Sequence, residues 1–263
     1  MTQTYLLLRG LTREARHWGA FPQQLSAALG ATACCIDLPG NGKWAHQASP
    51  ADLQQTLKWL RDELAVQNIQ PPFVLVSMSM GAMLSCLWAE RYPYELSGAA
   101  LINTSLRPFS PWYERLRPSN YLRLLNMAIR GAGRDWESSI LHLTSGRFDV
   151  NSEQGRHLVY QWQRIGQSAP VSRANAWRQL RAAIRFQASP SPPSVPLLLL
   201  SSAGDRLVNP DCSRLIARRW GIPHYEHPWA GHDLPLDAPD WVIEQVRVWQ
   251  NEVSRQDRGG QSG

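Results

Sequence analysis

The 263-residue sequence lacks any apolar run long enough to cross a membrane. Its longest apolar run, residues 195–200, contains Pro196 and has the length of a strand, whereas a membrane-spanning helix needs about 20 apolar residues. Residues 1–10 lack the positively charged start and long apolar core of a signal peptide. We therefore expect a cytoplasmic protein with no membrane partner.

Cysteine is scarce, and the four cysteines form no metal-binding or disulfide pattern. Cys34 and Cys35 are adjacent on an expected strand, so they point to opposite faces, and Cys86 and Cys212 stand on or near expected helices. No CxxC pair and no Cys/His cluster is present, which argues against structural zinc and against a disulfide framework. We interpret the thiols as free and buried, and expect no metal and no other cofactor.

Lysine is nearly absent, because Lys43 and Lys58 are the only two, so the net charge of +6 rests on arginine. A basic balance can indicate a nucleic-acid or anionic partner. However, the arginines are scattered, they form no basic run, and no nucleic-acid-binding motif accompanies them. We therefore expect no nucleic-acid partner.

Short apolar runs alternate with longer helical patterns along most of the chain. This alternation, with near-continuous apolar strands, predicts an α/β fold with a parallel sheet covered on both faces. The strands are expected at residues 5–8, 32–37, 73–77, 99–103, 195–201 and 224–227. The helices are expected at residues 21–29, 49–66, 81–91, 211–220 and 240–253.

The alternation is interrupted once, by a long block of helical segments rich in Trp, Arg and Leu. This block lies between two sheet strands, so we interpret it as an insertion over the sheet. The predicted organisation is a core of residues 1–105 and 189–255, a helical lid of residues 106–188, and a disordered tail of residues 256–263.

The segment with the clearest chemistry is Ser77-Met78-Ser79-Met80-Gly81, which lies between an apolar strand and a helix. A serine on such a sharp turn needs small residues two positions away on each side, because their backbones come close. Ser77 and Gly81 meet this need. The segment resembles the nucleophile elbow of the α/β-hydrolases, G-x-S-x-G, with Ser77 in place of the first glycine.

The resemblance to the α/β-hydrolase family extends along nearly the whole chain and implies its fold, a mostly parallel central sheet flanked by helices. Residues 6–11 resemble the loop that builds half of the oxyanion hole, with Arg9 where the family usually has histidine. The resemblance implies that the backbone N–H groups of Leu11 and Met80 hold the developing oxyanion. Residues 37–42 (DLPGNG) resemble the family's DLPGxG turn, which has a structural role.

Two further segments supply an acid and a base in the order that this fold requires, Ser, Asp, His. Asp205 follows an apolar strand in a segment that resembles G-x-x-D-x-x-V. His232 lies in Ala-Gly-His-Asp, which resembles the loop after the final strand. Asp211 and Asp233 are the alternatives for the acid, although Asp233 adjoins the histidine, where side-chain pairing is awkward.

Each residue type suits its implied role. A serine hydroxyl is a poor nucleophile near neutral pH, so a neutral imidazole must accept its proton. A buried carboxylate then orients the imidazole and compensates its transient charge. His17 and Trp18 follow the oxyanion loop, and two roles are open for them: they line the substrate pocket, or they pack beneath the lid.

These features predict a serine hydrolase that cleaves a small-molecule carboxylic ester through an acyl-enzyme. The chain also resembles the compact pimeloyl-ester hydrolases of biotin synthesis, although we match no pocket residues to them. The same triad permits thioester cleavage, carbon–carbon bond hydrolysis, or a lyase reaction resembling that of the menaquinone-pathway synthase. Dehalogenases and epoxide hydrolases of this fold need a carboxylate where Ser79 stands. A noncatalytic binding protein on this scaffold is disfavoured, because such proteins usually lose a triad member.

Overall fold

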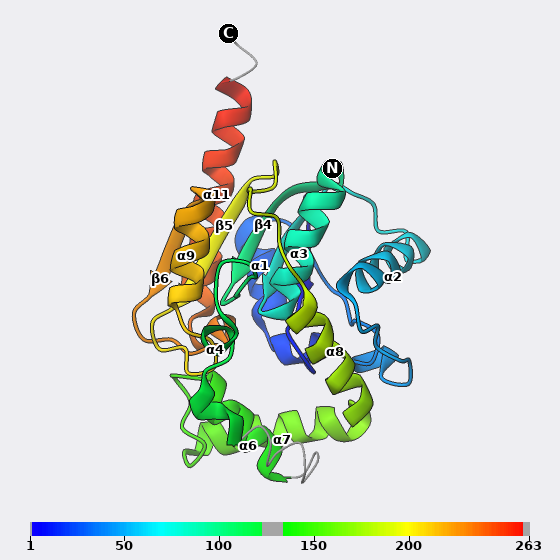
Figure 1. The fold of residues 1–263 in the computed structure, drawn as a ribbon, viewed down its shortest axis with the longest axis vertical. Coiled ribbons are helices and arrows are strands. Elements are labelled where there is room, and N and C mark those ends of the chain that lie inside the picture. Colours follow the sequence, from blue (N-terminus) through cyan, green and yellow to red (C-terminus); the bar gives the residue numbers. More distant parts are fainter. Residues whose placement is uncertain (1, 123–133, 260–263) are drawn as a thin grey trace.

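The computed structural model describes residues 2–122 and 134–259. Its centre is a six-stranded sheet in the order β2-β1-β3-β4-β5-β6, in which every neighbouring pair is parallel (Figure 1). The parallel sheet that the alternating pattern predicts is therefore confirmed. The strands are β1 Thr4–Leu8, β2 Thr32–Cys35, β3 Phe73–Met78, β4 Leu96–Ile102, β5 Leu197–Ser202 and β6 His224–His227.

Both faces of the sheet are buried because successive side chains alternate between two hydrophobic clusters. Leu6 and Leu8 pack with α2, α3 and α9, whereas Tyr5 and Leu7 pack with α1 and α11. This covering explains why the strands have apolar residues on both faces. The covering helices are α1 Phe21–Leu29, α2 Leu53–Val66, α3 Met80–Arg91, α9 Asp211–Trp220 and α11 Pro239–Gly259.

The remaining helices fall mostly within the expected insertion. Figure 1 shows α6 and α7 at one end of the molecule, with α8 leading back along the core. Leu141, Val159 and Trp162 form a small core between α6 and α7. Part of the insertion, residues 123–133, lies outside the described residues. The bounds are α4 Trp112–Arg115, α6 Arg134–Thr144, α7 Glu153–Ser168, α8 Arg173–Arg185 and α10 Leu234–Asp237, and the 3-10 helices are η1 Ala15–Trp18, η2 Gly42–Trp44, η3 Pro93–Glu95 and η4 Pro118–Asn120.

Several element ends differ from the prediction. The strand expected at residues 32–37 ends at Cys35, because Asp37 leaves the sheet and its carboxylate accepts the N–H of Ala15 at 2.7 Å and of Lys43 at 3.0 Å. The last helix reaches Gly259 and so enters the tail that we expected to be disordered. Residues 260–263 of that tail lie outside the described residues.

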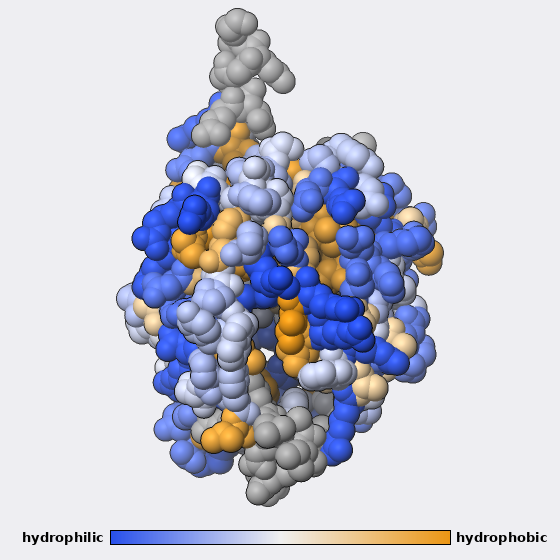
Figure 2. Space-filling view, in the orientation of Figure 1, coloured by the Kyte–Doolittle hydropathy of each residue, from blue (hydrophilic) through white to orange (hydrophobic). Residues whose placement is uncertain are grey.

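The surface and the thiols add two observations. Across the described ranges, no helix is both long and apolar enough to cross a membrane. Hydrophilic side chains cover much of the face in Figure 2, with apolar ones between them. All four cysteines are free, but only Cys86 and Cys212 are buried, whereas Cys34 and Cys35 are partly exposed. The interpretation of all four thiols as buried was therefore wrong for the two on β2, which is the edge strand of the sheet.

Candidate active site

Ser79 occupies the turn between β3 and α3 in a backbone conformation that side chains rarely adopt, with φ 55° and ψ −116°. Such a conformation costs roughly 1–3 kcal/mol and persists only where the surroundings impose it. Here the Ser79 N–H donates to the Ile102 carbonyl at 2.9 Å, and Thr104 Oγ1 donates to the Ser79 carbonyl at 3.1 Å. The backbone on both sides of the serine is thus fixed to the end of β4.

Two glycines allow the turn to pack against the end of β1. A Cβ on Gly81 would lie 2.5 Å from the Leu8 carbonyl oxygen, which is closer than real Cβ atoms come. A Cβ on Gly10 would lie 3.1 Å from the Ser79 Cβ and 3.5 Å from its Oγ. The loop after β1 therefore runs directly beside the serine hydroxyl. This close approach is the physical reason for a small residue at position 81.

Asp205 and His232 meet through a buried hydrogen bond, with 2.7 Å between Asp205 Oδ2 and His232 Nδ1. Both side chains are at most 4% exposed. The other carboxylate oxygen of Asp205 accepts the backbone N–H groups of Leu207 at 2.8 Å and Val208 at 2.9 Å. These two donors fix the carboxylate, so the carboxylate in turn can fix the imidazole.

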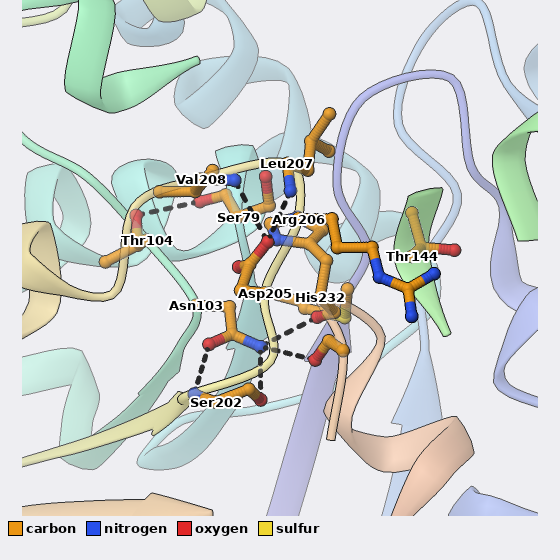
Figure 3. A network of polar contacts seen from close by, with 12 residues as sticks. Ser79, Asn103, Thr104, Thr144, Ser202, Asp205, Arg206, Leu207, Val208 and His232 are labelled. Carbon is orange, nitrogen blue, oxygen red and sulfur yellow. Dashed lines mark hydrogen bonds and ion pairs between the residues drawn. The ribbon is translucent and has the colours of Figure 1, made fainter. Parts of the chain in front are cut away.

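Figure 3 shows Ser79, Asp205 and His232 in one cluster, although they come from segments far apart in the sequence. Among the contacts of the described residues there is no hydrogen bond from the Ser79 hydroxyl to the imidazole, a contact that often tightens only when substrate binds. The two alternative acids lie in other contacts. Asp211 pairs with Arg214 on the surface, and Asp233 pairs with Arg9.

The two expected oxyanion donors belong to segments that adjoin Ser79, namely the start of α3 and the loop after β1. Met80 is the first residue of α3, whose first backbone N–H groups have no acceptor within the helix. Leu11 follows Gly10 in the loop beside Ser79. The next residue, Thr12, has a positive φ of 60°, and its N–H donates to Gln179 Oε1 of α8 at 2.9 Å. The insertion thereby holds the loop that carries the Leu11 amide.

Asn103 is a buried residue of this site to which sequence reasoning gave no role. Its Nδ2 donates to the His232 carbonyl at 2.8 Å and to the Ser202 hydroxyl at 2.9 Å, and its Oδ1 accepts the Ser202 N–H at 2.9 Å (Figure 3). It therefore ties the ends of β4 and β5 to the loop that carries the histidine. Its positive φ of 45°, a conformation that asparagine tolerates, ends the strand at Ile102 rather than at Asn103 as predicted.

Asp237 was also missed, because nothing in the local sequence sets it apart from a surface carboxylate. It is 1% exposed and accepts hydrogen bonds from the Ser145 hydroxyl at 2.5 Å, the Gly146 N–H at 2.6 Å and the Gly231 N–H at 2.7 Å. Burial raises the pKa of this carboxyl group, and its three donors oppose that shift. Asp237 thus joins the loop that follows α6 in the insertion to the loop before His232.

His17 and Trp18 are both buried. Trp18 stacks on Phe21 within the core, with ring centroids 5.5 Å apart. His17 lies edge-on to Trp162 of α7 at 5.9 Å, and its Nδ1 accepts the Glu14 N–H. His17 therefore packs against the insertion and Trp18 against the core, and the substrate-binding role for the two residues stays a prediction.

The burial of His17 predicts acid sensitivity. Burial, and then the charges of Arg13 and Arg9, hold the pKa of His17 well below its ordinary value. The unfolded chain takes up this proton below about pH 6.5 and the folded chain does not, so the free energy of unfolding falls as the pH drops from 7 to 5. We expect His17→Phe to reduce this loss, which has a limit of about 1.4 kcal/mol per pH unit for one proton.

Urea unfolding at pH 7 and pH 5 measures this effect. Burial also lowers the pKa values of His224 and His227. These two groups titrate in both proteins, so the difference between the two pH dependences isolates His17. Equal losses of stability in the wild type and the variant would contradict the assignment.

Across the residues that the structure describes, no group of three or more His, Cys, Asp or Glu side chains is arranged to hold a metal ion.

Comparison with known structures gives the same architecture. An esterase from Thermogutta terrifontis is 21% identical, with a TM-score of 0.74 over 95% of this chain and 90% of its own. The enol-lactonase from Burkholderia xenovorans is 16% identical, with a TM-score of 0.76 over 95% of this chain and 92% of its own. The 2-hydroxy-6-oxo-6-phenylhexa-2,4-dienoate hydrolase from Rhodococcus is 16% identical, with a TM-score of 0.76 over 95% and 91%.

These identities are low, so the likenesses to solved structures show the fold alone. A search of curated proteins finds no match to the sequence. The family is shown by a different comparison. Residues 5–245 match the model of the alpha/beta hydrolase family, a range that includes Ser79, Asp205 and His232. The parallel sheet, the flanking helices and the helical insertion agree with that match. The chain therefore belongs to the α/β hydrolase family.

Proposed function

We propose that this protein is a serine hydrolase that cleaves carboxylic esters, with Ser79 as nucleophile, His232 as general base and Asp205 as the group that orients the base. The observation that carries the proposal is the buried 2.7 Å contact between Asp205 and the Nδ1 atom of His232. An ionised carboxylate only accepts hydrogen bonds, so Nδ1 carries the imidazole proton. The other nitrogen, Nε2, is then free to accept a proton from Ser79.

The reaction follows from these roles. Ser79 Oγ attacks the ester carbonyl carbon while His232 Nε2 takes the hydroxyl proton, and the Leu11 and Met80 amides stabilise the oxyanion. The tetrahedral intermediate collapses, the C–O bond to the alcohol breaks, and the imidazolium protonates the departing alcohol. Water then attacks the acyl-enzyme with the same imidazole as base. The acid leaves, and the proton returns to Ser79.

A carboxylic ester is favoured because two of the similar structures, an esterase and an enol-lactonase, are named for ester-type substrates. The Rhodococcus enzyme is named for a dienoate, so carbon–carbon bond hydrolysis is tested as a competing outcome, together with thioester cleavage. Free thiols suit a reducing compartment, and we propose that the enzyme acts in the cytoplasm on a small molecule.

We expect the native protein to react covalently with a fluorophosphonate probe, because the probe captures a serine activated by a neighbouring base. Mass spectrometry should find one adduct per chain, on the peptide that contains Ser79. Chemically unfolded protein, which has lost the triad geometry, is the control and should not react. Absence of labelling on the native protein would overturn the enzyme assignment.

A substrate panel then separates the reaction classes. It contains p-nitrophenyl esters of increasing acyl length, the matching thioesters, and a vinylogous diketone acid that only a carbon–carbon bond hydrolase cleaves. We expect kcat/KM to be highest for an ester. A higher value for a thioester or for the diketone acid would replace the ester proposal with that activity on the same triad.

A further inference from the structure

Arg9 and Asp233 form a buried ion pair between the two ends of the chain. Nη1 of Arg9 lies 3.0 Å from Oδ1 of Asp233, and Nη2 lies 2.6 Å from Oδ2. The two side chains are only 4% and 3% exposed. This two-point geometry fixes the relative orientation of both groups as well as their distance.

The pair joins two loops of the proposed active site: the oxyanion loop, which carries the Leu11 amide, and the base loop, which carries the His232 imidazole. Arg9 directly precedes Gly10 and Leu11, and Gly10 lies against Ser79. Asp233 directly follows His232. The spacing between the oxyanion loop and the base loop is therefore set, in part, by this one ion pair.

Further contacts hold both partners in place. The Arg9 guanidinium stacks over the Trp18 ring at 4.7 Å, and its Nη1 lies 3.6 Å from the sulfur of Met78, the residue before Ser79. The N–H of Asp233 donates to the Thr144 carbonyl at 2.7 Å. The guanidinium thus fills a shaped, planar site that a lysine ammonium cannot reproduce.

We propose that Arg9 and Asp233 are positioning residues that hold the Leu11 amide and the His232 imidazole at fixed positions relative to Ser79. The inference rests on the proposed function. Stability alone does not require the pair, because replacing a buried ion pair by apolar residues of similar volume is often neutral or stabilising. Catalysis does require a fixed geometry, since a displacement of about 1 Å can cost on the order of 100-fold in rate.

The test compares an apolar replacement with a conservative one. Arg9→Met/Asp233→Leu removes both charges together, so no uncompensated charge is left in the interior. Arg9→Lys keeps the charge but loses the two-point contact. For both variants we expect kcat on a p-nitrophenyl ester to fall by about 10- to 100-fold, with KM within about 3-fold and Tm within a few degrees of the wild type.

Arg61→Met is the control for the loss of an ion pair far from the site. Arg61 forms a partly buried pair with Glu95, so its loss should lower Tm and leave kcat unchanged. Wild-type kcat in either the double variant or Arg9→Lys would show that the pair is merely structural and would overturn the inference. If the double variant does not fold, Arg9→Lys decides alone.

The fluorophosphonate reaction distinguishes this failure from failure of the proposed function. A wild type that does not react with the probe refutes the serine hydrolase itself. A wild type that reacts, together with variants that react at the same rate, refutes only the positioning role.

Discussion

Ser79→Ala is expected to lower kcat for a p-nitrophenyl ester by about 10⁵-fold or more, the scale found when a triad nucleophile is removed. The fold should tolerate the change, because the fixed contacts of this residue run through its backbone N–H and carbonyl to Ile102 and Thr104. Alanine keeps the same backbone, so we expect Tm to stay within a few degrees, which corresponds to about 1 kcal/mol in a chain of this length.

Steady-state kinetics, probe labelling and a thermal melt on the same preparation measure these effects. Ser85→Ala is the matched control: Ser85 lies on α3, the helix that follows Ser79, is buried, and donates to the Gly81 carbonyl at 3.1 Å. It should keep its activity and its labelling. A Ser79→Ala protein that retains a tenth of the wild-type activity, when purified in the same way, would refute the nucleophile assignment.

Asp205→Asn should lower kcat by about 10⁴-fold, the loss seen when the acid of such a triad becomes an amide. The reason lies in the contacts of the carboxylate. One oxygen accepts the N–H groups of Leu207 and Val208, and the other accepts the imidazole N–H. The single amide oxygen of asparagine will face the two backbone donors. Its NH2 group then faces His232 Nδ1, which moves the imidazole proton to Nε2, where it blocks transfer from Ser79.

Asp211→Asn is the control for this prediction, because Asp211 is the other acid that the sequence allows after β5. It is exposed and pairs with Arg214. We therefore expect kcat to change less than about 2-fold, because surface substitutions away from buried contacts usually have small effects. Kinetics across pH 5–9, with the melt as a check on folding, compare the two variants. Loss of activity in Asp211→Asn but not in Asp205→Asn would move the acid to residue 211.

The elements predicted most accurately from the sequence are those whose signal is local. The helices Phe21–Leu29 and Asp211–Trp220 and the strand His224–His227 have the predicted bounds, because periodicity and the flanking Gly30 and Gly221 are sufficient to define them. The end of the 32–37 strand was missed, because it depends on backbone donors from Ala15 and Lys43 that approach Asp37 in space.

The same division applies to the candidate site. The strand–serine–helix segment can be predicted from the sequence, because the sharp turn requires small residues close to Ser79 in the chain. The order Ser, Asp, His can also be read directly from the sequence. The sequence favoured Asp205 and left Asp211 and Asp233 as alternatives, because the partners of two of these residues are distant in the chain. Asp205 contacts His232 and Asp233 contacts Arg9, whereas Asp211 pairs with Arg214, three residues along the same helix.

The sequence by itself determined the alternating α/β architecture and the nucleophile turn, because both depend on the spacing of apolar and small residues along the chain. Only the tertiary structure decided which groups face one another: the Arg9–Asp233 pair, the Asn103 contacts that hold the His232 loop, and the Gln179 contact to the oxyanion loop. The physical reason is that a hydrogen bond or ion pair depends on distance in space. Residues 9 and 233 are 224 positions apart in the chain, and no local pattern records their approach.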